Sequence, residues 1–437
     1  MSSTGYNAIP FYLHAELLPN IRHITLYVSI PASIPAEQAH PQISLSSSRK
    51  AVTVSVSVPG TSDDVTDTLK LPARVVEASR RVLAAGTDAP NNGRVEHGMR
   101  EYSFRMQVES EDDGLSRPSQ VECLDGFVPW TARDMGPRTR VRCRGCPSVF
   151  LEPSLSLSPS EVEKGRDLAG WVWKDLPSGN WAEMMDFWHC HKPDTHPSDR
   201  DTNDAEKQTD VKGYGAANQV FASEGTVLVD VATFLVAQAD CRGLRKAELE
   251  KTDGDSKPEP ETIVCENCSA LIGVEDTVSQ GWRLFKTNIS ASKRDPDNPN
   301  GMVWETQSVE TVVAAQLLEL IERESARRFV VHCGQKDGLL LWVFNPDLRY
   351  SNSSPNHSIA ARQGMKVFFQ SVDDVDAVLH PAHGKISSLS LEELRLPSGV
   401  FLAMTKALLG SNSMLPGSGR IFREWQVGIL NRYDRAK

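Results

Sequence analysis

The chain has 437 residues, enough for two or three domains, and its hydrophobic share of 40% and charged share of 24% are ordinary for a globular protein. The formal net charge of -10 argues against a general nucleic-acid binder, because such proteins are normally basic. No apolar run approaches the length of a membrane span, so we do not expect a membrane protein.

The first hundred residues alternate apolar and small polar side chains, which is the pattern of half-buried antiparallel strands. The clearest segments are residues 24–30, 42–45, 51–58, 69–76 and 102–108. We predict that they form an antiparallel β-sandwich domain over residues 1–108.

Residues 109–142 begin with an acidic stretch that contains Pro and Gly, and we predict an acidic arm or loop there. This segment carries Cys123 outside any cysteine pair. A lone cysteine is most often a buried apolar residue. If Cys123 is exposed instead, it offers a partner a thiol, with the carboxylates of Glu122 and Asp125 beside it.

Two Cys-x2-Cys turns, Cys143 to Cys146 and Cys265 to Cys268, indicate structural zinc. Each turn holds two thiolates about a metal's width apart, and two such turns complete the tetrahedral coordination that zinc prefers. A small residue and a short apolar run follow each pair, as in a knuckle that leads into a strand. We therefore predict a zinc-binding region over residues 143–275.

A third group of possible ligands, His189, Cys190 and His191, lies between the two pairs. Adjacent residues seldom reach one metal from a regular helix or strand, so we favour a site that the two pairs close alone. The alternative is that Cys190 and His191 complete a site with Cys143 and Cys146, and it stays open.

The group follows a predicted helix at residues 181–188. Four apolar side chains there fall at helical spacing on one face, and we interpret them as core: Trp181, Met184, Met185 and Trp188. Residues 192–212 and 246–261 are polar and charged without apolar periodicity, which predicts surface linkers.

Residues 276–437 are predicted to form a mixed α/β domain, which makes the whole chain α+β. An apolar face over residues 309–321 indicates a helix, and strands are expected at residues 329–333, 339–344 and 366–370. The tail at residues 419–430 carries Phe422, Trp425 and Ile429 at near-helical spacing and should dock onto this domain.

Nothing in the motifs argues strongly for an enzyme. The chain has no GxxxxGK[ST] phosphate loop, no HExxH and no GxSxG. The last cysteine, Cys333, is the one candidate nucleophile, but it lies in an apolar strand, where burial raises a thiol's pKa and hides it. His380 and His383 could form a metal pair, although an exposed loop explains them better.

The order of the motifs resembles the HECT-like family of ubiquitin-conjugating-enzyme-binding proteins. The resemblance rests on the first Cys-x2-Cys, Leu176-Pro-Ser-Gly-Asn-Trp running into Trp188-His-Cys-His, the second Cys-x2-Cys, and Trp425-Gln-Val-Gly near the end. It covers most of the chain and implies binding of a ubiquitin-conjugating enzyme and HECT-like ubiquitin ligase activity. It also implies a link to the endonuclease that cleaves pre-messenger RNA before polyadenylation.

A HECT ligase passes ubiquitin through a thioester on a reactive cysteine in its C-terminal lobe, and that cysteine is missing here, because the last cysteine, Cys333, lies over a hundred residues before Lys437. We therefore expect a zinc-stabilised binding protein whose partner is a ubiquitin-conjugating enzyme or the mRNA 3'-end cleavage endonuclease, with a cysteine-thioester ligase as the alternative. Cysteines in Cys-x2-Cys pairs suit a reducing compartment, so we expect the nucleus and cytoplasm. With the endonuclease as partner, Cys123, Glu122 and Asp125 could enter its zinc site and hold it inactive.

Overall fold

The computed structural model describes residues 11–35, 40–57, 64–87, 94–96, 98–109, 126–153, 170–176, 220–247, 261–294, 301–353, 361–381 and 391–435. The chain forms two compact units, each described by itself. Unit 1 comprises Met1–Phe127, Val309–Ile321 and Ser325–Lys437, and unit 2 comprises Val128–Ser308 and Glu322–Glu324. None of the described helices is long and apolar enough to cross a membrane.

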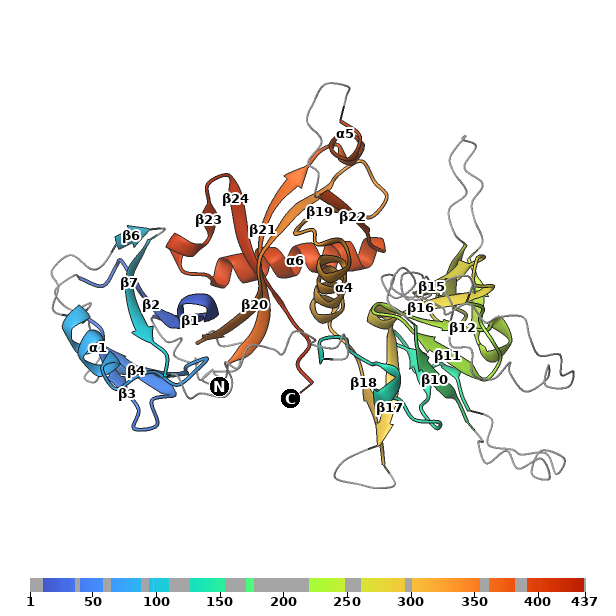
Figure 1. Ribbon diagram of the computed structural model, residues 1–437, viewed down its shortest axis with the longest axis horizontal. Coiled ribbons are helices and arrows are strands. Elements are labelled where there is room, and N and C mark those ends of the chain that lie inside the picture. Colours follow the sequence, from blue (N-terminus) through green and yellow to red (C-terminus); the bar gives the residue numbers. More distant parts are fainter. Residues whose placement is uncertain are drawn as a thin grey trace, which may run out of the picture. The chain divides into compact units, whose positions relative to one another are not determined.

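A large, mainly antiparallel sheet runs through unit 1, with ten strands among the described residues (Figure 1). Its main path is β23 (Ile421–Phe422), β24 (Trp425–Asn431), β21 (Arg362–Val372), β20 (Gly338–Asn352), β1 (Tyr12–Leu18), β2 (His23–Pro31), β7 (Met99–Gln107) and β6 (Arg94–Glu96). Beside β20 lie β19 (Arg328–His332) and then β22 (Leu391–Arg395), the latter parallel to β19.

This sheet joins the two ends of the chain, which the predicted division into separate domains at 1–108 and 276–437 did not anticipate. Strand β1 pairs with β2 on one side and with β20 on the other, so that Glu16 lies opposite Tyr350. Backbone pairing between distant strands leaves little trace in local alternation, because any strand with one apolar face can accept several neighbours.

A second, three-stranded layer covers part of the sheet. The layer consists of β3 (Gln42–Leu45), β4 (Ala51–Val56) and β5 (Val65–Lys70), with α1 (Ser79–Thr87) beside β3. One core joins the layers; Leu13, Leu26 and Val54 are among its fully buried side chains. The predicted strand at residues 69–76 is wrong: β5 lies earlier and ends at Lys70, and of residues 71–76 only Val75 pairs, in an isolated bridge with Val108.

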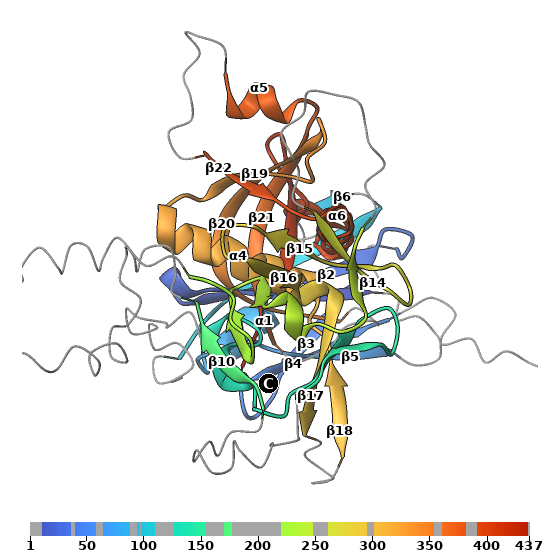
Figure 2. The ribbon, with the colours of Figure 1, turned by 90° about the vertical axis from the view of Figure 1, so that its right-hand side faces the viewer.

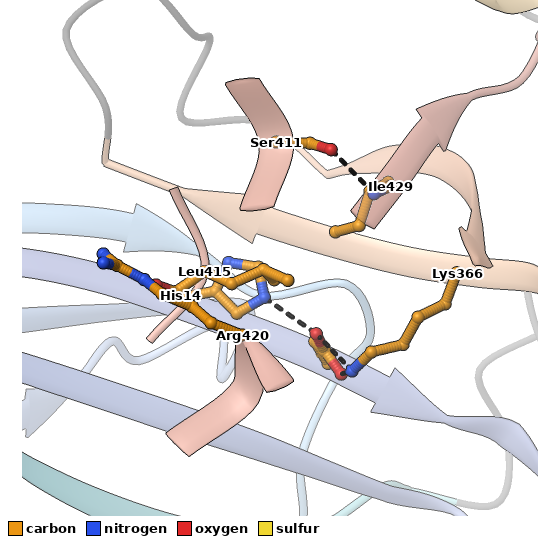
Figure 3. Close-up of polar contacts among 7 residues, drawn as sticks. His14, Lys366, Ser411, Leu415, Arg420 and Ile429 are labelled. Carbon is orange, nitrogen blue, oxygen red and sulfur yellow. Dashed lines mark hydrogen bonds and ion pairs between the residues drawn. The ribbon is translucent and has the colours of Figure 1, made fainter. Parts of the chain in front are cut away.

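Helix α6 (Ser398–Met414) packs against β24, and α4 (Val309–Glu324) is joined to β24 by hydrogen bonds from Asn431 to the Glu310 carboxylate. The predicted helix at 309–321 is confirmed as α4, whereas α6 was not predicted. α6 also protects the free edge of β24. The Ile429 backbone N–H donates to Ser411 Oγ at 2.8 Å (Figure 3), and Asn412 Nδ2 donates to the Val427 carbonyl at 2.8 Å. The edge therefore does not expose these backbone groups.

The tail docks onto the C-terminal elements, as predicted, but it does so as a strand although Phe422, Trp425 and Ile429 have near-helical spacing. β23 and β24 form a hairpin, and β24 pairs with β21 from Phe369 opposite Gln426 to Gly364 opposite Asn431. A spacing of three and four residues fits a helix face. Here β21 offers a complete ladder of backbone partners, so pairing overrides the local pattern.

A buried ion pair ties β1 to β21 within unit 1. Lys366 Nζ lies 3.0 and 2.7 Å from the two Glu16 oxygens, and His14 Nε2 lies 3.0 Å from Glu16 Oε1 (Figure 3). Burial by itself would raise the pKa of Glu16, but the Lys366 charge and the His14 hydrogen bond outweigh burial and hold that pKa far below its usual range. Glu16 is therefore ionised inside the sheet.

Unit 2 contains two mainly antiparallel sheets around one core. The first has the order β10 (Val172–Asp175), β11 (Thr226–Val229), β12 (Thr233–Val236), β16 (Gly281–Phe285), β15 (Leu271–Asp276), β14 (Thr262–Cys265) and β13 (Leu244–Lys246). The second has the order β18 (Met302–Glu305), β17 (Ile289–Arg294), β8 (Val141–Cys143) and β9 (Val149–Leu151), with β17 and β18 as a long hairpin in Figure 2. Their shared core includes Trp130, Phe234 and Trp282.

Candidate metal centre

The two Cys-x2-Cys turns come together in unit 2. Cys143 ends β8 and Cys265 ends β14, and their partners Cys146 and Cys268 lie in the turns that follow. The four Sγ atoms all lie within 4.8 Å of one another. The distances from Cys143 to Cys268 and from Cys146 to Cys265 are both 3.6 Å. Four thiolates around zinc, with Zn–S of about 2.3 Å, would stand about 3.8 Å apart, so the cluster has the size of a metal site.

The two turns are built in the same way. The Cys143 N–H donates to the Ser148 carbonyl at 3.0 Å, and the Cys265 N–H donates to the Ala270 carbonyl at 2.9 Å. Both bonds span five residues and close the turn behind its first cysteine. In the first turn, the Gly145 N–H also donates to Cys143 Sγ at 3.3 Å, a contact that stabilises a thiolate.

Space and charge around the sulfurs also suit a cation. Cys143 and Cys265 are buried, while Cys268 is exposed. Without a cation, burial raises the pKa of Cys143 to about 12, whereas hydrogen bonds from the Asn267 and Ser148 side chains lower that of Cys146 to about 6. Four thiolates in one cluster need a positive charge to offset their repulsion. Since all four positions are protein ligands, the arrangement is that of a closed structural site.

Asn288 links the two cysteine turns through hydrogen bonds. Nothing in the sequence around Asn288 had indicated this role. Its carbonyl accepts from the Arg144 N–H at 3.1 Å, and its Nδ2 donates to the Leu271 carbonyl at 2.9 Å. The Arg144 guanidinium donates to the carbonyls of Thr287 and Gln307 at 2.8 and 2.9 Å. The first turn is therefore anchored to the strand that follows the second.

Several predicted site residues lie outside the described residues. They are Glu122, Cys123 and Asp125 of the predicted arm, Cys190 and His191 as alternative ligands with the adjoining His189, the predicted helix at 181–188, and His383. His380 is described; its exposed ring lies 3.1 Å from Asp376 Oδ1 at the end of α5 (Val375–Leu379).

Cys333 lies at the turn just after β19, and not inside that strand as predicted. Its thiol is half-buried. The neighbouring imidazole is already engaged, because His332 Nδ1 accepts from the Gly334 N–H at 3.1 Å and Nε2 lies 2.8 Å from Glu393 Oε1. His332 therefore donates from Nε2 to Glu393 and has no lone pair left to activate a thiol.

Two further groups of unit 2 were missed by sequence reasoning. Cys241 is half-buried and its S–H donates to the Ala237 carbonyl at 3.7 Å; burial raises the pKa of this thiol to about 12, so it is unreactive. Lys286 is fully buried, and its Nζ donates to the Pro129 carbonyl at 2.8 Å with the Phe234 ring centre 5.5 Å away. Burial lowers the pKa of Lys286 to about 7, and the Asp230, Asp175 and Asp134 charges only partly oppose that change.

Lys286 should make the stability of unit 2 depend on pH. The unfolded lysine titrates near 10.5 and the folded one near 7, so between these values the unfolded chain binds more protons and stability rises with pH, by up to about 1.4 kcal/mol per pH unit. We expect the melting temperature of unit 2 to rise from pH 7 to pH 9, and that rise to shrink in Lys286→Met. Calorimetry of both proteins at each pH measures the difference. An identical pH profile in the two proteins would contradict a neutral buried amine.

Comparison with known proteins gives a consistent picture. The family model described as HECT-like ubiquitin-conjugating enzyme (E2)-binding matches residues 16–427. An uncharacterized protein of Saccharomyces cerevisiae is 24% identical over 261 residues, which cover 60% of this chain and 63% of that protein. A human E3 ubiquitin-protein ligase is 27% identical over 281 residues, covering 58% of this chain and 66% of its own length.

A third relative, an uncharacterized protein of Schizosaccharomyces pombe, is 23% identical over 320 residues, or 70% of this chain and 78% of its own. The match therefore spans just under two thirds of the length of the yeast and human relatives named first. No solved structure gives a significant match.

Proposed function

Because the chain belongs to the HECT-like ubiquitin-conjugating enzyme (E2)-binding family, we propose that it binds a ubiquitin-conjugating enzyme. The observation that carries this proposal is the extent of the family match. Residues 16–427 run through both compact units, so the matched feature is the whole two-unit chain and not a short zinc motif that many unrelated proteins share.

In this proposal the four-cysteine cluster has a structural role. We propose that Cys143, Cys146, Cys265 and Cys268 hold one Zn²⁺, since four thiolates in a closed set suit zinc better than Ca²⁺ or Mg²⁺, which take oxygen ligands. The metal would join the turn after β8 to the turn after β14 and so link the two sheets of unit 2. Binding of the enzyme needs no open metal position in this scheme.

Direct binding tests the proposal. The purified full chain is titrated against a panel of ubiquitin-conjugating enzymes, each with and without a ubiquitin thioester, in isothermal titration calorimetry. We expect saturable binding to at least one enzyme, and no binding to free ubiquitin alone under the same conditions. If no enzyme of the panel binds the folded chain, the proposal is wrong.

A ligase that carries ubiquitin on its own cysteine is the second candidate, because the human relative is named an E3 ubiquitin-protein ligase. Among the described cysteines, four lie in the cluster and Cys241 is unreactive, which leaves Cys333. The engaged His332 disfavours this route. A ubiquitin adduct on the chain that reducing agent cleaves, and that Cys333→Ala loses, would establish the thioester ligase.

The finer proposal is that the chain binds and regulates the pre-mRNA 3'-end cleavage endonuclease in the nucleus and cytoplasm. This proposal rests on the sequence resemblance and on the chemistry of Cys123, whose thiol could ligate a nuclease metal with Glu122 and Asp125 beside it. Cleavage assays with the parent chain and with Cys123→Ala test it. Equal inhibition by both proteins would remove Cys123 from the mechanism.

A further inference from the structure

Unit 1 carries a stack of three aromatic rings on one face of its large sheet. Phe344 of β20 stacks on Phe368 of β21, with ring centres 4.9 Å apart and planes 20° apart. Phe368 stacks in turn on Phe422 of β23, at 5.0 Å and 17°. Trp342 makes edge contacts with Phe344 and Phe368, at 6.1 and 5.3 Å. The rings come from three strands and form one continuous row.

The outer rings of this row are open to solvent. Phe344 is 52% exposed and Phe422 is 44% exposed, whereas the central Phe368 is only 4% exposed. Ile421, next to Phe422, is 59% exposed. Two exposed aromatic rings stacked on one buried ring, with an exposed isoleucine beside them, form an apolar patch, and such a patch marks an interaction site more often than scattered apolar residues do.

The local backbone directs these rings to the surface. The pairing of β20 with β21 shifts register between Val343 and Asn345, so Phe344 is the extra residue of a β-bulge. Bulges redirect a side chain and are common at functional sites. The neighbouring Trp342 and Phe368 hold the Phe344 ring from two sides, so the surface is formed before any partner arrives.

Helix α6 does not cover the row, because it packs on the other face of the sheet. A Cβ added to Gly428 would meet the Leu408 side chain of α6 at 2.9 Å. Gly428 follows Val427 on β24, and Val427 lies opposite Phe368 in the pairing of β24 with β21. Successive strand residues point to opposite faces, so Phe368 and its stacked neighbours lie on the face away from α6.

Cations lie over Phe422 of the row and over the adjoining Trp342. The Arg328 guanidinium is 5.3 Å from the Trp342 ring centre, and the Arg423 guanidinium is 5.6 Å from that of Phe422. The nearby Glu424 carboxylate accepts the Trp425 indole N–H at 3.0 Å. Aromatic and arginine side chains are the types that dominate binding energy in protein interfaces. A complementary partner would present an apolar side chain flanked by carboxylates.

We infer that the aromatic surface of Phe344, Phe368 and Phe422, with Arg423 over Phe422 and Arg328 over the adjoining Trp342, is the docking site for the ubiquitin-conjugating enzyme; this inference rests on the proposed function. Single-stranded nucleic acid also stacks on aromatic rings. It needs several cations along its backbone, however, while this surface has two arginines on a chain of net charge -10. A folded protein partner therefore fits better.

The test uses the full chain and a ubiquitin-conjugating enzyme that binds the parent. Phe344→Ser and Phe422→Ser remove the exposed rings, and Arg423→Glu reverses one charge. Leu402→Ser is the matched control, since Leu402 is 65% exposed on α6, on the other face. We expect each ring variant to weaken binding by about tenfold or more in calorimetry, with unchanged melting temperature, and Leu402→Ser to bind like the parent.

Each outcome decides the inference. Parent-like binding by Phe344→Ser, Phe422→Ser and Arg423→Glu would overturn it and leave the proposed function standing. Failure of the parent to bind any enzyme would overturn both. If the ring variants instead lose binding to a single-stranded RNA oligonucleotide, or lose a dimer seen by light scattering, while they keep the enzyme, the surface belongs to that other partner. If Phe422→Ser alone loses stability as well as enzyme binding, its loss of binding can come from unfolding. The binding of Phe344→Ser and Arg423→Glu then decides the inference.

Discussion

We expect Cys143→Ser to unfold unit 2 and to abolish binding of the zinc ion that we propose for the four-cysteine cluster. A structural zinc site of this kind contributes on the order of 10 kcal/mol to folding, which exceeds the whole stability of many domains. Loss of one of the four ligands removes most of that contribution, because the remaining thiolates no longer enclose the metal. Elemental analysis of the purified protein measures its zinc content, and thermal unfolding followed by circular dichroism measures its stability.

Cysteines outside the cluster provide the control. Cys241→Ser and Cys333→Ser should keep one zinc and melt close to the parent, since neither thiol belongs to the cluster. A strong chelator should reproduce the effect of Cys143→Ser in the parent. The presence of soluble, folded protein without any metal would contradict the site, and a metal that survives Cys265→Ser but not Cys190→Ser would favour the alternative ligands.

Replacing Glu16 with glutamine will destabilise unit 1 by about 3 kcal/mol or more, because it leaves the Lys366 ammonium without its anionic partner in a largely buried place. The lowered pKa of Glu16 gives a second expectation. The stability from this carboxylate is complete above its unfolded pKa of about 4.5 and is lost as the pH falls toward the folded value. Denaturant unfolding at pH 7 and at pH 4 measures both.

A double variant separates the charge effect from simple loss of packing. Glu16→Gln with Lys366→Met removes both charges, and should recover part of the stability that Glu16→Gln loses alone. Lys336→Met is the matched surface control. Lys336 forms an exposed pair with Asp374 at 3.3 Å, so its loss should change stability by less than about 1 kcal/mol. Equal effects of the buried and the exposed substitutions would contradict the role of the buried pair.

The amino-acid sequence by itself determined the local elements with strong patterns. The period of two in residues 51–56 specifies a half-buried strand, and the apolar face of residues 309–321 specifies a helix, because each pattern follows from the geometry of a single element. The spacing of the two Cys-x2-Cys pairs likewise identified the residues able to hold a metal.

Only the tertiary structure decided which distant elements meet. The sulfurs of Cys143 and Cys268 are 3.6 Å apart although 125 residues separate them, and β1 pairs with β20 from the other end of the chain. The aromatic surface likewise combines Phe344, Phe368 and Phe422 from three strands. Local propensity carries no information on such meetings, because backbone pairing accepts many partners and the choice depends on the burial of the whole core.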